Sequence, residues 1–273
     1  MLRQGVNTQR FFITIFTLKA IGASVEVLAL VLCFFEIVGG VMELGYFFCG
    51  DLLGFSNIVK NLNSHDLEAR VAEWVALVEV TAKNHAIEKI QLISDTVFAA
   101  VGKDKNDLKK LINFARDLLN HGILKSFPIR GAISYGNFNW DGSLVYGSPV
   151  IKAHALEQRQ KWIGIILDVP ALAEREYVDM GLVCYPVPME PGSHIVIHAV
   201  VAWSIPKFEE LLIILMSGGL SIKGERLTWG WGDKFQNTIL FGLYIEILKK
   251  AKASPASFGW ASPLHPIYMA LAQ

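Results

Sequence analysis

Short apolar runs and long amphipathic stripes follow one another in a regular order from about residue 44 onward. Residues 44–51 form an apolar run typical of a buried strand, and a short helix is expected over 56–61. Residues 64–85 then place apolar side chains at helical spacing, with Ser64 or Asp66 as the expected N-cap. Strands that alternate with such helices need a sheet on which the helices can bury their apolar sides.

The rest of the chain continues this alternation. Residues 87–102 predict two short strands joined at Ser94-Asp95, and a helix ending at Gly122 follows. Asp141-Gly142 is a strong hairpin signal between two further strands. Further elements are expected as helices over 149–158, 171–177, 205–216 and 234–250 and as strands over 162–168, 182–189 and 194–203. The order predicts an α+β fold, a mainly antiparallel sheet with helices packed on one face.

The first 41 residues do not follow this pattern. Residues 20–42 are mostly apolar, but Glu26 and Glu36 interrupt them, and a bilayer span needs about 20 apolar residues. Three interpretations stay open for residues 1–41: an over-extended gene whose true start is Met42, a packed accessory element, or a membrane anchor. We expect one domain over residues 42–273 and a cytoplasmic location, with membrane association through residues 20–42 disfavoured.

Charge and cysteine usage exclude several classes of function. The 273 residues carry a formal net charge of zero, and Lys and Arg form no block. Nucleic acid is therefore not an expected partner, because binding it needs a concentrated positive patch. The cysteines Cys33, Cys49 and Cys184 match no zinc spacing, and we interpret them as buried thiols of a reducing compartment.

Asp51 and Asp95 are the sharpest candidates for a functional pair. Asp51 ends the strand of residues 44–51, where it either caps the next helix or holds a metal, and Asp95 lies in a hairpin turn. If their strands are neighbours, the two carboxylates converge. Paired carboxylates suit Mg²⁺ or Mn²⁺ with a polyphosphate, since hard cations take oxygen ligands. An N-cap and a turn aspartate would explain the same residues without a metal.

The sequences around both aspartates resemble the metal motifs of the class III nucleotide cyclases. The first motif of that family, F-x-D-[IL]-x-G-F-[ST], is matched by Asp51, Leu52, Gly54, Phe55 and Ser56. "IEKIQLISDTVFAAVG" resembles the second motif, with Asp95 as its aspartate and Ser94 in place of its glycine. "IRGAISYG" and "YGSPVIKAHALE" are similar to a later strand and helix of the family. The resemblance covers residues 45–168 in the family's order.

Four positions depart from the purine cyclases of that family. Ile151 and Ala155 stand where the family has an asparagine and an arginine, and Gln91 and Leu144 stand at its base-reading positions. A site that lacks the residues that recognise a purine base either selects another base or is inactive. Over residues 42–243 the chain resembles the pyrimidine cyclases of the bacterial antiphage system Pycsar, which make cyclic UMP or cyclic CMP. Glu190 stands where that branch often has a lysine.

The resemblance implies a metal-dependent pyrimidine nucleotide cyclase. It would convert UTP to cyclic UMP and pyrophosphate, as a second messenger for antiphage defence that a separate effector reads. The implied cofactor is Mn²⁺ or Mg²⁺, two ions per site, held by Asp51, Asp95 and the main-chain carbonyl of Leu52. The implied assembly is a homodimer with shared active sites.

Other residues and alternatives complete this hypothesis. Lys152, Arg159 and Lys161 are candidates to replace the missing arginine. The expected substrate-binding residues are Gly54, Phe55, Ser56, Gln91, Arg130 and Lys152. The alternatives are a catalytically inactive protein of the cyclase fold that dimerises or senses nucleotides, and a membrane-anchored cyclase.

Overall fold

The computed structural model describes residues 42–142, 144–190, 197–203, 220–222, 225–227 and 233–251. The chain divides into two units, Met1–Val41 and Met42–Gln273, and every described residue belongs to the second. The extension over residues 1–41 and the helix expected over 205–216 lie outside the described residues. No helix in the described part of the chain is long and apolar enough to cross a membrane.

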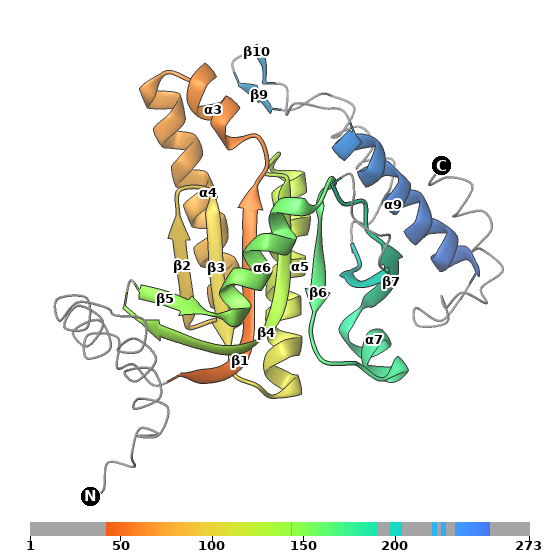
Figure 1. Cartoon of the computed structure of the whole chain (residues 1–273). Coiled ribbons are helices and arrows are strands. Elements are labelled where there is room, and N and C mark those ends of the chain that lie inside the picture. The colour runs from red at the N-terminus through yellow and green to blue at the C-terminus, as the bar shows by residue number, and fades with distance from the viewer. Residues whose placement is uncertain are drawn as a thin grey trace, which may run out of the picture. The chain divides into compact units, whose positions relative to one another are not determined.

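An eight-stranded sheet is the framework of this unit (Figure 1). Its strands lie in the order β2-β3-β1-β4-β6-β8-β7, and β5 pairs with β4. The β4–β6 pair is parallel, and the other pairs of this sheet are antiparallel. The strand bounds are β1 Glu43–Leu52, β2 Lys89–Ile93, β3 Thr96–Val101, β4 Ile129–Asp141, β5 Leu144–Gly147, β6 Gly164–Asp168, β7 Leu182–Pro186 and β8 Ile197–Val201. β9 (Leu220–Ile222) and β10 (Glu225–Leu227) form a separate ladder.

The helices connect these strands in the predicted order. Strand β1, a helical segment, the β2–β3 hairpin, a helix and β4 follow one another, and these strands lie as β2-β3-β1-β4. This is the ferredoxin-like arrangement, so the predicted α+β class and mainly antiparallel sheet are confirmed. The helix bounds are α3 Phe55–Asn61, α4 Ser64–Asn84, α5 Lys105–Leu124, α6 Ser148–Arg159, α7 Glu174–Met180 and α9 Asp233–Ala251.

Strand β1 is covered on both faces. The Phe48 ring meets Phe114 of α5 edge to face, with centroids 5.8 Å apart, and α4 contacts α5 on that side. The next residue, Cys49, faces His154 of α6. Successive strand residues point to opposite faces, so α6 lies on the face opposite α5, as Figure 1 shows. One helical face was expected, and α6 adds a second. This explains why residues 45–50 are all buried.

Helix α7 begins and ends three residues later than expected, and α4 and α5 each have an end whose difference has a local cause. The N-cap of α4 is Asn63, not Ser64 or Asp66, because the Asn63 Oδ1 accepts a 3.0 Å hydrogen bond from the Asp66 N–H. Helix α5 continues past Gly122 to Leu124. A Cβ at Gly122 would lie 2.6 Å from the Phe127 carbonyl oxygen, so this glycine permits a close backbone approach instead of ending the helix.

Candidate functional site

Asp51 lies at the end of β1, where both neighbouring strands present polar side chains to it. In the sheet register it lies opposite Thr96 of β3 and Arg130 of β4. Thr96 Oγ1 donates a 3.2 Å hydrogen bond to Asp51 Oδ1, and Arg130 Nη2 lies 4.0 Å from Asp51 Oδ2. The N-cap of α3 is Gly54, with no side-chain cap. Asp51 therefore does not cap this helix, and the simpler of its two interpretations is wrong.

Asp95 lies in the β2–β3 turn, next to the end of β1. The Leu52 N–H donates a 3.3 Å hydrogen bond to the Asp95 carbonyl oxygen, which joins the turn to this strand end. Ser94, at the glycine position of the cyclase motif, has a φ of 58°. A left-handed conformation costs a residue other than glycine about 1 kcal/mol. Both predicted carboxylates thus belong to one end of the sheet.

The two carboxylates interact electrostatically. Burial, and then the negative charge of Asp95, raise the pKa of Asp51 above its ordinary value, while Arg130 and the Thr96 hydrogen bond lower it. The negative charge of Asp95 that raises the pKa of Asp51 also attracts a divalent cation, which removes the repulsion. The donor set is all oxygen, which fits Mg²⁺ or Mn²⁺.

The turn after β1 carries the other residues of the first motif. Gly54 has a φ of 83°, a left-handed conformation that favours glycine. Phe55 packs against the core and against Ile58, whereas Ser56 is exposed. Leu52 pairs with Ile129 and is buried.

Arg130 is buried against the chain's own polar groups. Its Nε and Nη2 each lie 2.6 Å from Glu157 Oε1, and its Nη1 donates a 2.9 Å hydrogen bond to the Gln160 carbonyl. Burial raises the pKa of Glu157 to about 7, against the opposing effect of Arg130. Arg130 is one of the expected substrate-binding residues. In this chain its side chain links Asp51 on β1 to Glu157 on α6.

Gln91 and Lys152 are also expected to bind substrate, and the structure places them in different parts of the fold. Gln91 pairs with Phe98, which pairs with Cys49, so Gln91 shares the sheet face of Cys49 and Asp51. The Lys152 Nζ lies 3.9 Å from the Asp168 Oδ2. On β4, Asp168 lies opposite Ser134, which is four residues after Arg130, the residue opposite Asp51. This ion pair therefore lies about 13 Å along β4 from Asp51.

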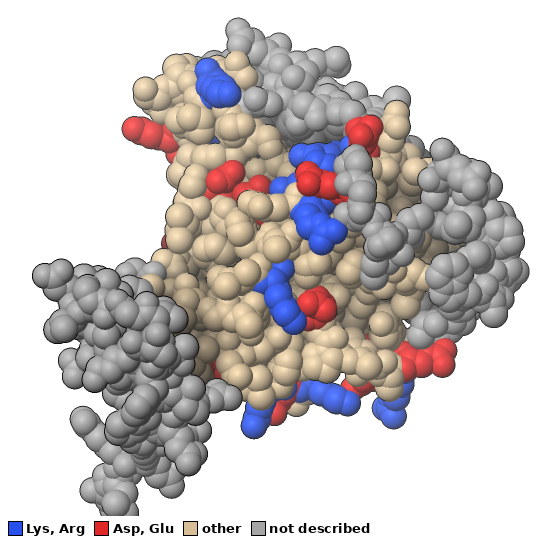
Figure 2. All heavy atoms as spheres, in the orientation of Figure 1, with Lys and Arg blue, Asp and Glu red and all other residues tan. Residues whose placement is uncertain are grey.

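The two substituted motif positions on α6 face outward. Ile151 is 72% exposed, and Ala155, one turn later on α6, is also exposed. Lys161 forms a 2.7 Å ion pair with Glu190, the residue that replaces a lysine of the Pycsar branch. Lys161 is thus already paired with a carboxylate. On the face drawn in Figure 2, Lys and Arg lie among Asp and Glu and do not form a patch of one sign.

The sequence reasoning did not identify Lys234 as a site residue. This lysine lies in the first turn of α9, which is held in place because Asn237 Nδ2 donates to the Lys161 carbonyl and Thr238 Oγ1 accepts from the Ile163 N–H. Burial, then Arg130 and Lys161, lower the pKa of Lys234, while Asp51 and Glu157 raise it. Its charge therefore acts on the candidate site.

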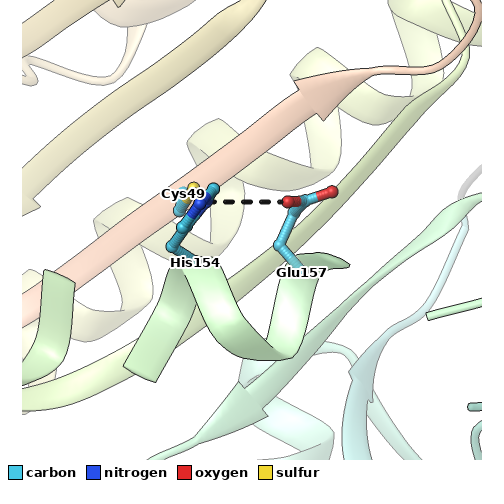
Figure 3. Close-up of side chains that lie close together, drawn as sticks. All are labelled: Cys49, His154 and Glu157. Carbon is cyan, nitrogen blue, oxygen red and sulfur yellow. Dashed lines mark hydrogen bonds and ion pairs between the residues drawn. The ribbon is translucent and has the colours of Figure 1, made fainter. Parts of the chain in front are cut away.

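A second group of side chains that was not foreseen lies between β1 and α6 (Figure 3). His154 Nδ1 is 4.0 Å from Cys49 Sγ and 3.9 Å from Glu157 Oε2. The buried thiol was expected, but its neighbours were not, because they are far from it in sequence. The only local signal is the spacing of His154 and Glu157, which places them on one side of a helix.

No protein-family model matches the chain, and no curated protein is significantly similar to it. Solved structures that resemble it are nucleotide cyclase domains. The adenylyl cyclase CyaB from P. aeruginosa is 16% identical, covers 61% of this chain and 97% of its own, and has a TM-score of 0.44. The guanylyl cyclase domain of the RhoGC fusion protein from the aquatic fungus Blastocladiella emersonii is 19% identical over 59% and 96%, with a TM-score of 0.46.

The guanylate cyclase domain of RhGC from Catenaria anguillulae, solved in complex with GTP, is a third similar structure. It is 18% identical, covers 59% of this chain and 98% of its own, and has a TM-score of 0.45. At these identities and TM-scores, we infer the function of this chain from the residues of its site and not from these structures.

Proposed function

We propose that this chain is a metal-dependent nucleotide cyclase that converts UTP to cyclic UMP and pyrophosphate. The observation that carries the proposal is the position of Asp51 and Asp95 at one end of the sheet, each inside a sequence that resembles a cyclase metal motif. The proposed role is the production of a second messenger in antiphage defence, which a separate effector reads.

The cofactor in this proposal is Mn²⁺ or Mg²⁺, held by the carboxylates of Asp51 and Asp95 and the main-chain carbonyl of Leu52. Thr96 orients the Asp51 carboxylate through its hydrogen bond. When bound, two such cations lower the pKa of the ribose 3′-hydroxyl and neutralise the triphosphate. The backbone N–H groups of Gly54, Phe55 and Ser56, at the start of α3, are proposed to bind the phosphates, because those of Leu52 and Leu53 already donate to the Asp95 and Pro128 carbonyls.

The reaction also needs positive charge near the leaving pyrophosphate, because phosphoryl transfer depends mainly on charge stabilisation. The arginine position of the family is Ala155, and Lys152 and Lys161 pair with Asp168 and Glu190. Arg130 is occupied by Glu157, and Lys234 is a further cation whose charge interacts with Asp51. We propose that Lys234 replaces the family's arginine and stabilises the charge on the leaving pyrophosphate.

Base selection rests on Gln91 and Leu144 in this proposal. An amide at position 91 donates and accepts hydrogen bonds, as the uracil edge requires. Leu144 pairs with Asp141 of β4, whereas Asp51 pairs with Arg130 of the same strand. Asp141 and Arg130 are eleven residues apart, a separation of roughly 35 Å in an extended strand. One chain therefore does not bring Leu144 to its own Asp51, which supports a homodimer whose sites are shared between two copies.

The test is an assay of the purified chain with UTP, CTP, ATP or GTP, each with Mn²⁺. We expect a cyclic monophosphate from UTP. A product from ATP or GTP alone would contradict the pyrimidine assignment. If all four nucleotides stay intact, the second candidate applies: an inactive protein of this fold that dimerises or senses nucleotides. The apolar, exposed Ile151 at the asparagine position is the observation that favours it.

A further inference from the structure

We propose that Cys49, His154 and Glu157 form a second metal site, separate from the Asp51–Asp95 pair, that binds a borderline-soft divalent cation such as Zn²⁺ (Figure 3). The proposal does not depend on the proposed cyclase activity. It follows from the positions of one sulfur, one nitrogen and one oxygen atom that face one another between β1 and α6.

The geometry is close to that of a tetrahedral zinc site. The three potential ligand atoms lie within 4.8 Å of one another, with 4.0 Å between Cys49 Sγ and His154 Nδ1 and 3.9 Å between His154 Nδ1 and Glu157 Oε2. Usual zinc bond lengths place neighbouring tetrahedral ligands roughly 3.3–3.6 Å apart. A shift of about half an ångström by His154, whose side chain is 51% exposed, closes the two distances that involve its ring. The third, between Cys49 Sγ and Glu157 Oε2, is at most 4.8 Å, and rotation of the Glu157 carboxylate closes it.

Two of the ligands are already held in place by the fold. Cys49 is fully buried in β1, between its register partners Phe98 and Ala132. Glu157 is 2% exposed, and Arg130 holds its Oε1, which leaves Oε2 directed at His154. A ligating carboxylate that is oriented by a second hydrogen bond is typical of metal sites.

The third ligand supplies the route of entry. His154 is the exposed member of the group, and its Nε2 lies 3.1 Å from the Gln158 side-chain amide. A histidine that binds metal through Nδ1 carries its proton on Nε2, so the Gln158 amide turns its oxygen toward the ring and accepts this N–H, which fixes the ring. The fourth position is open to water from the His154 side.

The donor types separate this site from the carboxylate pair. Thiolate and imidazole ligands select zinc, whereas a site made only of oxygen atoms suits Mg²⁺ or Mn²⁺. Binding of Zn²⁺ releases the thiol proton of Cys49 to solvent and joins β1 to α6 through the metal. Zinc therefore stabilises the packing of α6 on the sheet.

The test measures zinc bound to the full-length chain, without an affinity tag, by equilibrium dialysis and elemental analysis. We expect one tightly bound Zn²⁺ per chain. Cys49→Ala and His154→Ala should each weaken binding by at least about tenfold. Cys184→Ala and His65→Ala are the matched controls and should bind as the unmodified chain does, because these residues lie outside the group. With Co²⁺ as the probe, a thiolate-to-cobalt charge-transfer band should appear and be lost in Cys49→Ala.

Folding and site identity are checked in the same series. His154 is half exposed, so His154→Ala should melt at the temperature of the unmodified chain when both are measured in EDTA. Zinc that stays bound in Cys49→Ala and His154→Ala overturns the proposal, as does an unmodified chain that binds none. Zinc that is lost in Asp51→Asn and Asp95→Asn but kept in His154→Ala would place the ion on the carboxylate pair, which also overturns it.

Discussion

Arg130 and Glu157 form a buried ion pair in which the Nε and Nη2 of the arginine both lie 2.6 Å from one carboxylate oxygen. Arg130 comes from β4 and Glu157 from α6, and the same guanidinium lies 4.0 Å from Asp51. The pair therefore connects the helix that carries the altered motif to the strand that carries the first proposed metal ligand.

Glu157→Ala should destabilise the fold by about 3–5 kcal/mol, because it leaves the Arg130 charge buried without its partner. Urea unfolding in EDTA at pH 8 measures the change in the free energy of unfolding. Glu246→Ala is the control, since the Glu246–Lys249 pair is 33% and 51% exposed and should contribute less than about 1 kcal/mol. Equal losses in both variants would contradict the structural role of the buried pair.

The raised pKa of Glu157 predicts a pH dependence of stability. Burial raises this pKa from 4.5 to about 7, so the folded state holds a proton that the unfolded chain releases. The contribution of Glu157 to stability is then fully present below pH 4.5 and is lost as the pH rises toward 7. Urea midpoints of the unmodified chain and Glu157→Gln, measured in EDTA from pH 4.5 to 8, should diverge over this range. Parallel curves would show that Glu157 has an ordinary pKa.

Asp51→Asn and Asp95→Asn should each lower UTP turnover by at least about 100-fold, because each removes one proposed metal ligand. Both variants keep the volume of the side chain, so the melting temperature should change little. The assay is release of pyrophosphate in Mn²⁺. Full activity in either variant would contradict the metal assignment.

Lys234→Met should lower the rate of UTP turnover by about 100-fold if its charge stabilises the departing pyrophosphate. Lys249→Met, on the same helix, is the matched control, because Lys249 pairs with Glu246 on the surface. Single-turnover rates separate this effect from weaker UTP binding. An unchanged rate in Lys234→Met would contradict this role, and Arg159 or another cation would then have to replace the family's arginine.

Local pattern predicted much of the fold. The apolar run of residues 44–51, the Ser94-Asp95 turn and the Asp141-Gly142 turn each specify their conformation within a few residues, and the structure forms strands and turns there. The pairing of β1 with β3 and β4 follows from the ferredoxin-like order. Asp51 and Asp95 could be found from sequence because each lies inside a local motif.

Tertiary contacts account for what was not predicted. Gly122 looked like a helix end, but the backbone of Phe127 passes too close for a side chain there. Cys49 lies close to His154, which is more than a hundred residues away in the sequence. Lys234 interacts electrostatically with Asp51 over a still longer separation in sequence. The spacing of residues in the sequence does not predict these contacts, because they depend on how α6 and α9 pack against the sheet.

The docking of α9 has a consequence for the order in which the protein matures. The Lys161 carbonyl and the Ile163 N–H hold the start of this helix through Asn237 and Thr238. During synthesis at roughly 5–20 residues per second, β1 to β6 leave the ribosome several seconds before α9 does. A nascent chain thus displays its carboxylate pair before Lys234 exists, so a newly made copy gains the positive charge of Lys234 seconds after the two carboxylates.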